Sequence, residues 1–163
     1  MKKVISIAIV ENQEEDKNVL ESYIRKYQID SSDYDFNITY FQSGILFVDK
    51  YKSNFDIVFM DIDMPQMDGL ETAKKIREVD SKVLIIFITN LAQMAIKGYS
   101  VNAFDFVPKS VSYYEFSTML TRALNKNSFD RKTDLIIKSG RKTVKIDALS
   151  IVYAEVITET SNP

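Results

Sequence analysis

Short runs of apolar residues alternate along the chain with segments in which apolar side chains recur about every three or four positions. Nearly unbroken apolar runs rich in β-branched residues are typical of strands buried on both faces. Apolar residues that recur every three or four positions are typical of helices with one buried side. The run VISIAIV near the N-terminus is the clearest strand pattern. We predict strands over residues 4–10, 35–41, 56–60, 82–89 and 103–107, and helices over 14–27, 43–52, 68–79, 91–100 and 112–126.

Two of the predicted helices begin with a capping-box sequence. Asp68 is followed three positions later by Glu71, and Ser112 by Glu115. In a capping box the first side chain accepts a hydrogen bond from an N–H of the first turn, and the later acid returns one. We therefore interpret Asp68 and Glu71 as helix-start residues, and we interpret Asp56, which opens a strand, as structural.

Alternating strands and helices predict the α/β fold class. Strands that are apolar throughout need helices on both faces of a parallel sheet. We expect a doubly wound, five-stranded, flavodoxin-like domain of strand order 2-1-3-4-5 over residues 1–125. Residues 126–133 are polar and linker-like, and 134–163 predict strand, Ser-Gly turn, strand and a further strand. We expect this last segment to be the beginning of a second domain that is cut off.

Composition narrows the possible chemistry. Of the 163 residues, 45% are hydrophobic, enough to build a core, and the net charge of −2 argues against a generally basic nucleic-acid binder. Histidine and cysteine are absent, which excludes thiolate chemistry, an imidazole base and the usual zinc ligands. We find no signal-peptide pattern and no apolar run long enough to span a bilayer, so we expect a cytoplasmic protein without a membrane partner.

Polar residues follow the predicted strands at the points where they end. Glu11 and Asn12 follow the first strand, Asp61 the third and Lys109 the fifth, and Thr89 ends the fourth. The carboxyl ends of parallel strands meet at one edge of the sheet, where ligands of such folds bind. Any one of these residues alone would be an ordinary turn or surface residue, but together they predict a site.

The residues at this edge suit phosphoryl transfer. Clustered carboxylates repel one another unless a cation lies among them, and oxygen ligands with water suit Mg²⁺. With the cation beside it, the Asp61 carboxylate would act as nucleophile and form an aspartyl phosphate. Lys109 would offer a positive charge to the phosphate, and Thr89 a hydroxyl hydrogen bond.

Four stretches resemble the receiver domain of bacterial response regulators: AIVEN, DIVFMDIDMPQMDGLE, IIFITN and AFDFVPKS. The resemblance covers roughly residues 3–125, and the stretch around Asp61 is its most specific part. It implies a phosphoacceptor of a two-component system that takes phosphate from a sensor histidine kinase onto Asp61 and is not a turnover enzyme. It also implies Mg²⁺ held by Glu11, Asn12, Asp61 and the backbone carbonyl of Asp63.

The same resemblance implies a conformational switch. Thr89 corresponds to the switch hydroxyl, Phe106 to the aromatic switch residue and Lys109 to the phosphate-binding lysine. The face made by the fourth helix, fifth strand and fifth helix would then repack and pair two receivers in a homodimer.

The segment LIIKSGRKTVKIDALSIVYAEV is similar to the opening strands of LytTR-type DNA-binding domains. This similarity implies transcription control by a full-length protein. DNA would be the partner of that protein rather than of this chain, because the residues expected to contact bases would lie beyond Pro163.

Two positions depart from the receiver pattern and keep an alternative open. Asn12 stands where a second acid is usual, and Ser110 follows Lys109 where a proline is usual. The alternative is a degenerate receiver that acts as a phosphorylation-independent interaction module. A haloacid-dehalogenase-type phosphatase is disfavoured because the pair Asp61 and Asp63 follows the third strand rather than the first. An EF-hand is excluded because Pro65 occupies a ligand position.

Overall fold

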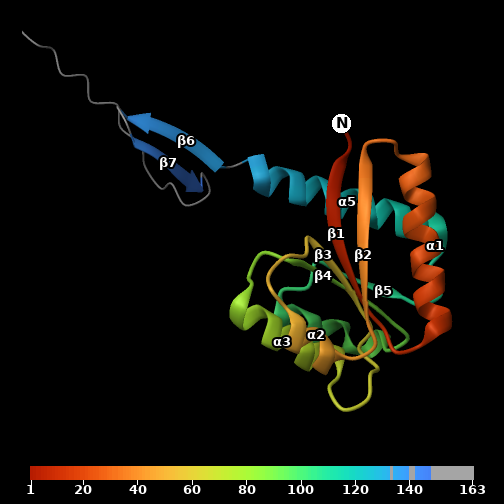
Figure 1. Cartoon of the computed structure of the whole chain (residues 1–163). Coiled ribbons are helices and arrows are strands. Elements are labelled where there is room, and N and C mark those ends of the chain that lie inside the picture. Colours follow the sequence, from red (N-terminus) through yellow and green to blue (C-terminus); the bar gives the residue numbers. More distant parts are fainter. Residues whose placement is uncertain (133, 140–141, 148–163) are drawn as a thin grey trace, which may run out of the picture. The chain divides into compact units, whose positions relative to one another are not determined.

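In the computed structural model of the protein, five parallel strands form one sheet in the order β2-β1-β3-β4-β5 (Figure 1). The structure describes residues 1–132, 134–139 and 142–147. The predicted fold class and strand order are confirmed, with element boundaries within about two residues of the predicted ones in most cases. The strands are β1 (Lys3–Val10), β2 (Tyr34–Phe41), β3 (Ile57–Met60), β4 (Leu84–Thr89) and β5 (Asp105–Pro108).

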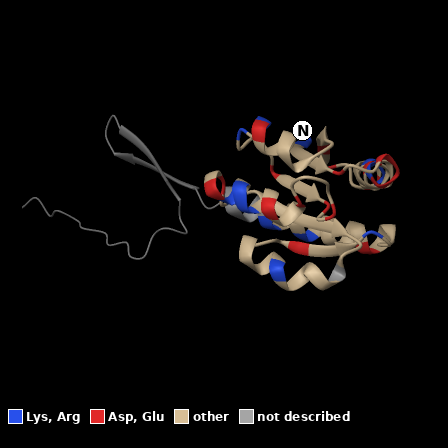
Figure 2. Ribbon diagram, turned by 90° about the horizontal axis from the view of Figure 1, so that it is seen from below, with Lys and Arg blue, Asp and Glu red and all other residues tan. Residues whose placement is uncertain are grey.

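Helices cover both faces of the sheet, each over its own apolar core. On one face lie α1 (Glu14–Asp30) and α5 (Tyr113–Lys132), which pack Ile24 and Phe116 against β1 and β3. On the other lie α2 (Gly44–Lys50) and α3 (Gly69–Val79), which contribute Phe47 and Ile76. Red and blue segments occur together on the helices in Figure 2, so acidic and basic residues are mixed on the surface.

The predicted capping boxes differ in how completely they form. Ser112 Oγ accepts from the Glu115 N–H at 3.2 Å, and the Glu115 carboxylate accepts from the Ser112 N–H at 2.9 Å, so this box is complete. At the start of α3, Asp68 Oδ1 accepts from the Glu71 N–H at 2.8 Å. Asp68 is therefore a helix cap, as predicted.

The segment between β4 and β5 is less regular than the single short helix predicted over residues 91–100. A 3₁₀ turn, η1 (Ala92–Met94), leads into the four-residue α4 (Ala95–Gly98) and a second 3₁₀ turn, η2 (Tyr99–Val101). Asn102 then adopts the left-handed conformation, with φ 49° and ψ 52°, which ends the segment.

The helix predicted to end at residue 126 is longer in the structure, because α5 continues to Lys132 and so includes most of the predicted linker over residues 126–133. The residues from 125 to 132 are polar except for Phe129, but they include neither proline nor glycine, so nothing in this stretch interrupts the helical hydrogen bonds. The chain divides into compact units at residues 1–124 and 125–163, so the division falls within this helix.

In the second unit, β6 (Asp134–Ser139) and β7 (Lys142–Asp147) pair antiparallel, with Leu135 opposite Ile146. This agrees with the two predicted strands, and the turn predicted between them lies outside the described residues. The third strand predicted after them lies outside the described residues.

Candidate functional site

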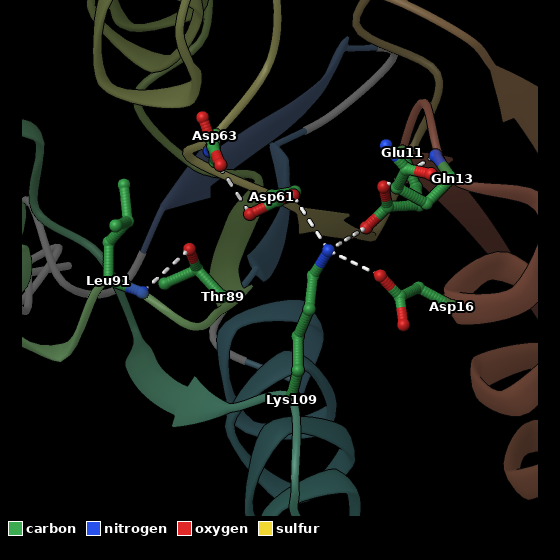
Figure 3. A network of polar contacts seen from close by, with 8 residues as sticks. All are labelled: Glu11, Gln13, Asp16, Asp61, Asp63, Thr89, Leu91 and Lys109. Carbon is green, nitrogen blue, oxygen red and sulfur yellow. Dashed lines mark hydrogen bonds and ion pairs between the residues drawn. The ribbon is translucent and has the colours of Figure 1, made fainter.

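Lys109 lies at the centre of a group of carboxylates at the carboxyl edge of the sheet (Figure 3). Its Nζ is 2.8 Å from Asp61 Oδ2 and 3.0 Å from Glu11 Oε2. The strands β1, β3 and β5 end at this edge and deliver one residue each. Only 2% of the Asp61 side chain and 11% of that of Lys109 are exposed, so water screens their attraction weakly. The order Pro108–Lys109–Ser110 does not keep the lysine from Asp61.

A third carboxylate, that of Asp16, also binds Lys109 and was not predicted from the sequence. Its Oδ2 lies 2.6 Å from Lys109 Nζ. Asp16 belongs to the first turn of α1, where the sequence places three consecutive acids. Acidic residues in a first turn are ordinarily explained by their favourable interaction with the helix dipole. The sequence therefore gives no separate sign that Asp16 binds Lys109. Which of the three acids faces the sheet edge depends on how α1 is rotated about its axis, and the sequence does not fix that rotation.

The crowding of charge shifts the ionisation of the group. Burial alone would lower the pKa of Lys109, but its hydrogen bonds to Asp16, Asp61 and Glu11 raise the pKa above the ordinary value. Burial raises the pKa of Glu11, with the nearby Asp61 charge acting in the same direction, while the Gln13 N–H and Lys109 partly oppose it. Lys109 therefore stays protonated, and a further cation beside Glu11 and Asp61 would be favourable.

The loop after β3 fixes the Asp61 carboxylate from the other side. The Asp63 N–H donates to Asp61 Oδ1 at 3.1 Å, so both carboxylate oxygens have a partner. Gly69, the first residue of α3, donates its N–H to the Ile62 carbonyl at 3.0 Å. An added Cβ on Gly69 would collide with the backbone of Asp61 and Ile62, so α3 begins directly against the backbone of this loop.

Asn12 offers an oxygen that no residue in the described part of the chain satisfies. Its side-chain Oδ1 is buried and has no hydrogen-bond partner. A buried acceptor without a partner costs about 1–3 kcal/mol, so such atoms ordinarily bind a water or a cation. Mg²⁺ is usually held by one or two carboxylates with water and phosphate oxygens, and it prefers oxygen ligands. Glu11, Asn12 and Asp61 therefore fit Mg²⁺.

The ligands expected for Mg²⁺ include an amide, Asn12, and two carboxylates, Glu11 and Asp61, that also contact the Lys109 ammonium. In the part of the chain that the structure describes, no three or more His, Cys, Asp or Glu side chains are grouped as a metal site. The fit to Mg²⁺ therefore rests on an amide oxygen and two carboxylates that Lys109 shares.

Thr89 and Phe106 lie apart from this network. Thr89 is fully buried, and its Oγ1 accepts from the Leu91 N–H at 3.2 Å rather than contacting Asp61 (Figure 3). Phe106 is half-buried against Phe87, with ring centroids 6.0 Å apart. The structure thus places the expected switch pair on β4 and β5, with the hydroxyl turned into the loop that follows β4.

The fold is that of a receiver domain, and comparison with known families agrees. The response regulator receiver domain family matches residues 7–121. The chain therefore belongs to the response regulator receiver domain family, whose members are phosphoacceptor signalling modules that bind Mg²⁺ in the active site, work with a histidine kinase and are generally not turnover enzymes. None of the helices that the structure describes is long and apolar enough to cross a membrane.

Individual relatives share part of their length with the chain. The sensory transduction protein LytT of Oceanobacillus iheyensis is 30% identical over 111 residues, which cover 62% of this chain and 44% of that protein. The probable transcriptional regulator ycf29 of Porphyra purpurea is 29% identical over 132 residues, which cover 77% of this chain and 59% of that protein. The chain thus spans roughly half the length of these two relatives.

Solved structures agree with the fold. The response regulatory domain of protein mrkE from Klebsiella pneumoniae is 24% identical, with a TM-score of 0.66 over 77% of this chain and 99% of that one. A receiver domain of a sensor histidine kinase from Pseudomonas aeruginosa is 22% identical, with a TM-score of 0.63 over 76% and 99%. Its structure has a magnesium ion coordinated in the active-site cleft.

Proposed function

We propose that Asp61 is the phosphoacceptor, that a sensor histidine kinase supplies the phosphoryl group, and that the product controls transcription. One observation carries the proposal. Asp61 is a buried carboxylate, fixed on one oxygen by Lys109 and on the other by the Asp63 N–H. Asn12, which follows β1 at the same edge of the sheet, adds a buried amide oxygen without a hydrogen-bond partner among the described residues. A buried nucleophile held between a cation and a backbone donor is oriented for attack.

The residues around Asp61 have separate proposed roles in phosphorylation. Mg²⁺ held by Glu11, Asn12, Asp61 and the Asp63 carbonyl would neutralise charge on the transferring phosphoryl group. Lys109 places a protonated amine within 2.8 Å of the nucleophilic carboxylate and holds charge where phosphoryl oxygens arrive. Thr89 reaches the phosphoryl group after it releases the Leu91 N–H, and Phe106 packs into the space that Thr89 leaves.

The output is proposed to be a LytTR-type DNA-binding domain that begins with β6 and β7. Two observations support this: the antiparallel pairing of these strands, and the similarity to relatives named LytT. Dimerisation through the face of α4, β5 and α5 is supported by Ile96 and Tyr99, whose side chains are 80% and 87% exposed. Exposed apolar side chains on one helical segment are typical of a protein interface.

The phosphoacceptor is tested by intact-protein mass after incubation with acetyl phosphate and Mg²⁺. We expect the native chain to gain one phosphoryl group and Asp61→Ala to gain none, because the nucleophile is removed. Asp63→Asn is the matched control, since it neutralises a neighbouring exposed acid and keeps the backbone N–H that binds Asp61. If the native chain gains no mass under these conditions, the degenerate receiver is the correct function.

The role of Asn12 is tested by restoring a carboxylate at that position. We expect Asn12→Asp to bind Mg²⁺ on the order of tenfold more tightly, because an ionised oxygen binds a cation more strongly than a neutral one. Titration calorimetry without phosphate measures this directly. Asn18→Asp, on the exposed surface of α1, adds the same charge away from the site and should change the affinity little. Equal gains in the two variants would remove Asn12 from the ligand set.

A further inference from the structure

We propose that Asp16 is a positioning residue that holds Lys109 in the unphosphorylated protein and restrains phosphorylation until it lets the lysine go. This inference rests on the proposed function, since it concerns the reaction at Asp61. It begins from a count of hydrogen bonds. A lysine ammonium has three N–H donors, and Lys109 faces three carboxylates at 2.6, 2.8 and 3.0 Å.

The arrangement leaves Lys109 without a donor for an arriving phosphoryl group. Asp61 Oδ2, Glu11 Oε2 and Asp16 Oδ2 surround the ammonium (Figure 3). Phosphoryl oxygens on Asp61 would need at least one of these N–H groups. One carboxylate must therefore be exchanged for a phosphoryl oxygen when the reaction proceeds.

Asp16 is the partner that is least costly to exchange. Its side chain is 39% exposed, against 7% for Glu11 and 2% for Asp61. Water can solvate the released Asp16 carboxylate, whereas releasing Glu11 would leave a buried carboxylate without its cation, held only by the Gln13 N–H among the contacts described. Asp16 also lies 93 residues from Lys109 in sequence, so its release frees the first turn of α1 from the segment after β5.

Both electrostatic effects of Asp16 oppose phosphorylation. The carboxylate competes for the Lys109 ammonium, and its negative charge repels an incoming phosphate. Removing the charge should therefore make the chain a better phosphoacceptor. A residue that served only the fold would have the opposite effect, because its loss would loosen the site.

The experiment compares Asp16→Asn with Glu15→Gln. Glu15 lies in the same first turn of α1, is exposed and makes no ion pair with Lys109. We expect the initial rate of phosphoryl gain from acetyl phosphate to rise about two- to fivefold in Asp16→Asn, the range of a partly exposed ion pair. We expect less change in Glu15→Gln. The gain should shrink at high ionic strength, because salt screens exposed charges.

A second measurement follows Lys109 without Mg²⁺ or phosphate. Amine acylation at limiting reagent, read by peptide mass spectrometry, reports how accessible the Lys109 amine is to the reagent. Losing the Asp16 contact opens one side of the Lys109 ammonium, so Asp16→Asn should be labelled faster at Lys109 than either the native chain or Glu15→Gln. Both results together support the inference.

The possible failures are distinct. If the native chain is phosphorylated but Asp16→Asn reacts no faster than Glu15→Gln, the restraint by Asp16 is wrong and the proposed function stands. If Lys109 is labelled equally in all three proteins, Asp16 does not hold the lysine in solution. If no protein gains a phosphoryl group, the proposed function fails and the restraint fails with it.

Discussion

Lys109→Met is expected to lower the free energy of unfolding of the metal-free protein by about 3–5 kcal/mol, the cost of leaving buried charges without their partner. Methionine keeps most of the length of the side chain and removes the ammonium between Asp61 and Glu11. The two carboxylates, 2% and 7% exposed, would then face each other without a cation. Urea denaturation without Mg²⁺ measures the loss.

The pH dependence of this effect has a definite sign. The pKa of Lys109 is raised in the folded protein, so its contribution to stability is complete below the ordinary value of 10.5. That contribution is lost as the pH rises through the raised pKa. The difference between native and Lys109→Met should therefore be full at neutral pH and shrink in alkaline solution above 10.5.

Mg²⁺ and a matched variant separate the charge effect from lost packing. Mg²⁺ should stabilise Lys109→Met more than the native chain, because it supplies the missing positive charge beside Asp61. Lys75→Met removes an exposed lysine on α3 and should change stability by no more than about 0.5 kcal/mol. A Lys109→Met protein as stable as the native chain would mean that the ammonium is not needed to hold the carboxylates.

The same substitution should slow phosphorylation of Asp61 by about 10²-fold, which is typical for loss of one group that stabilises charge in a transition state. Acetyl phosphate is the suitable donor and Mg²⁺ should be saturating. The metal recovers the stability that Lys109→Met loses, so a slower rate then reports the missing charge at the reaction itself. An unchanged rate would assign the charge of Lys109 to stability alone.

The parts of the site that the sequence predicts are those set by the topology of the sheet. A parallel sheet brings the ends of its strands to one edge, so Glu11, Asp61 and Lys109 could be placed together from strand patterns alone. The contact of Asp16 could not, because it depends on how α1 is rotated about its axis. Three acids share the first turn of that helix, and one of them reaches the lysine.

Local conformations were predicted less well than topology, for related reasons. The segment of α4 is broken into three short pieces, and its end depends on a left-handed Asn102 that no periodicity reveals. The hydroxyl of Thr89 accepts from Leu91, a rotamer choice that the sequence leaves open. The extension of α5 to Lys132 was missed because polar composition was taken as a sign of a linker.

Gly69→Ala is expected to destabilise the protein by about 3 kcal/mol and to displace Asp61, the proposed phosphoacceptor. A Cβ at Gly69 would lie 2.8 Å from Ile62 Cα and 2.9 Å from the Asp61 carbonyl carbon, distances that real Cβ atoms essentially never show. These atoms belong to the backbone, so no side-chain rotation relieves the clash, and overpacked sites of this kind typically cost 1–3 kcal/mol or more. The start of α3 or the loop that carries Asp61 has to move.

A second glycine provides a control of opposite sign. A Cβ at Gly98 meets its nearest atoms at 3.6 Å and 3.8 Å, in ordinary contact with Ala103 and Phe106, and Gly98 lies in α4. Gly98→Ala should therefore leave stability unchanged or raise it by up to about 1 kcal/mol, the helix preference of alanine.

Urea denaturation and the phosphorylation rate are measured on both variants. We expect Gly69→Ala to lose rate as well as stability, because a displacement of about 1 Å at a reacting group can cost 10²-fold. If both alanines behave alike, the close approach of α3 to Asp61 is not what positions the phosphoacceptor.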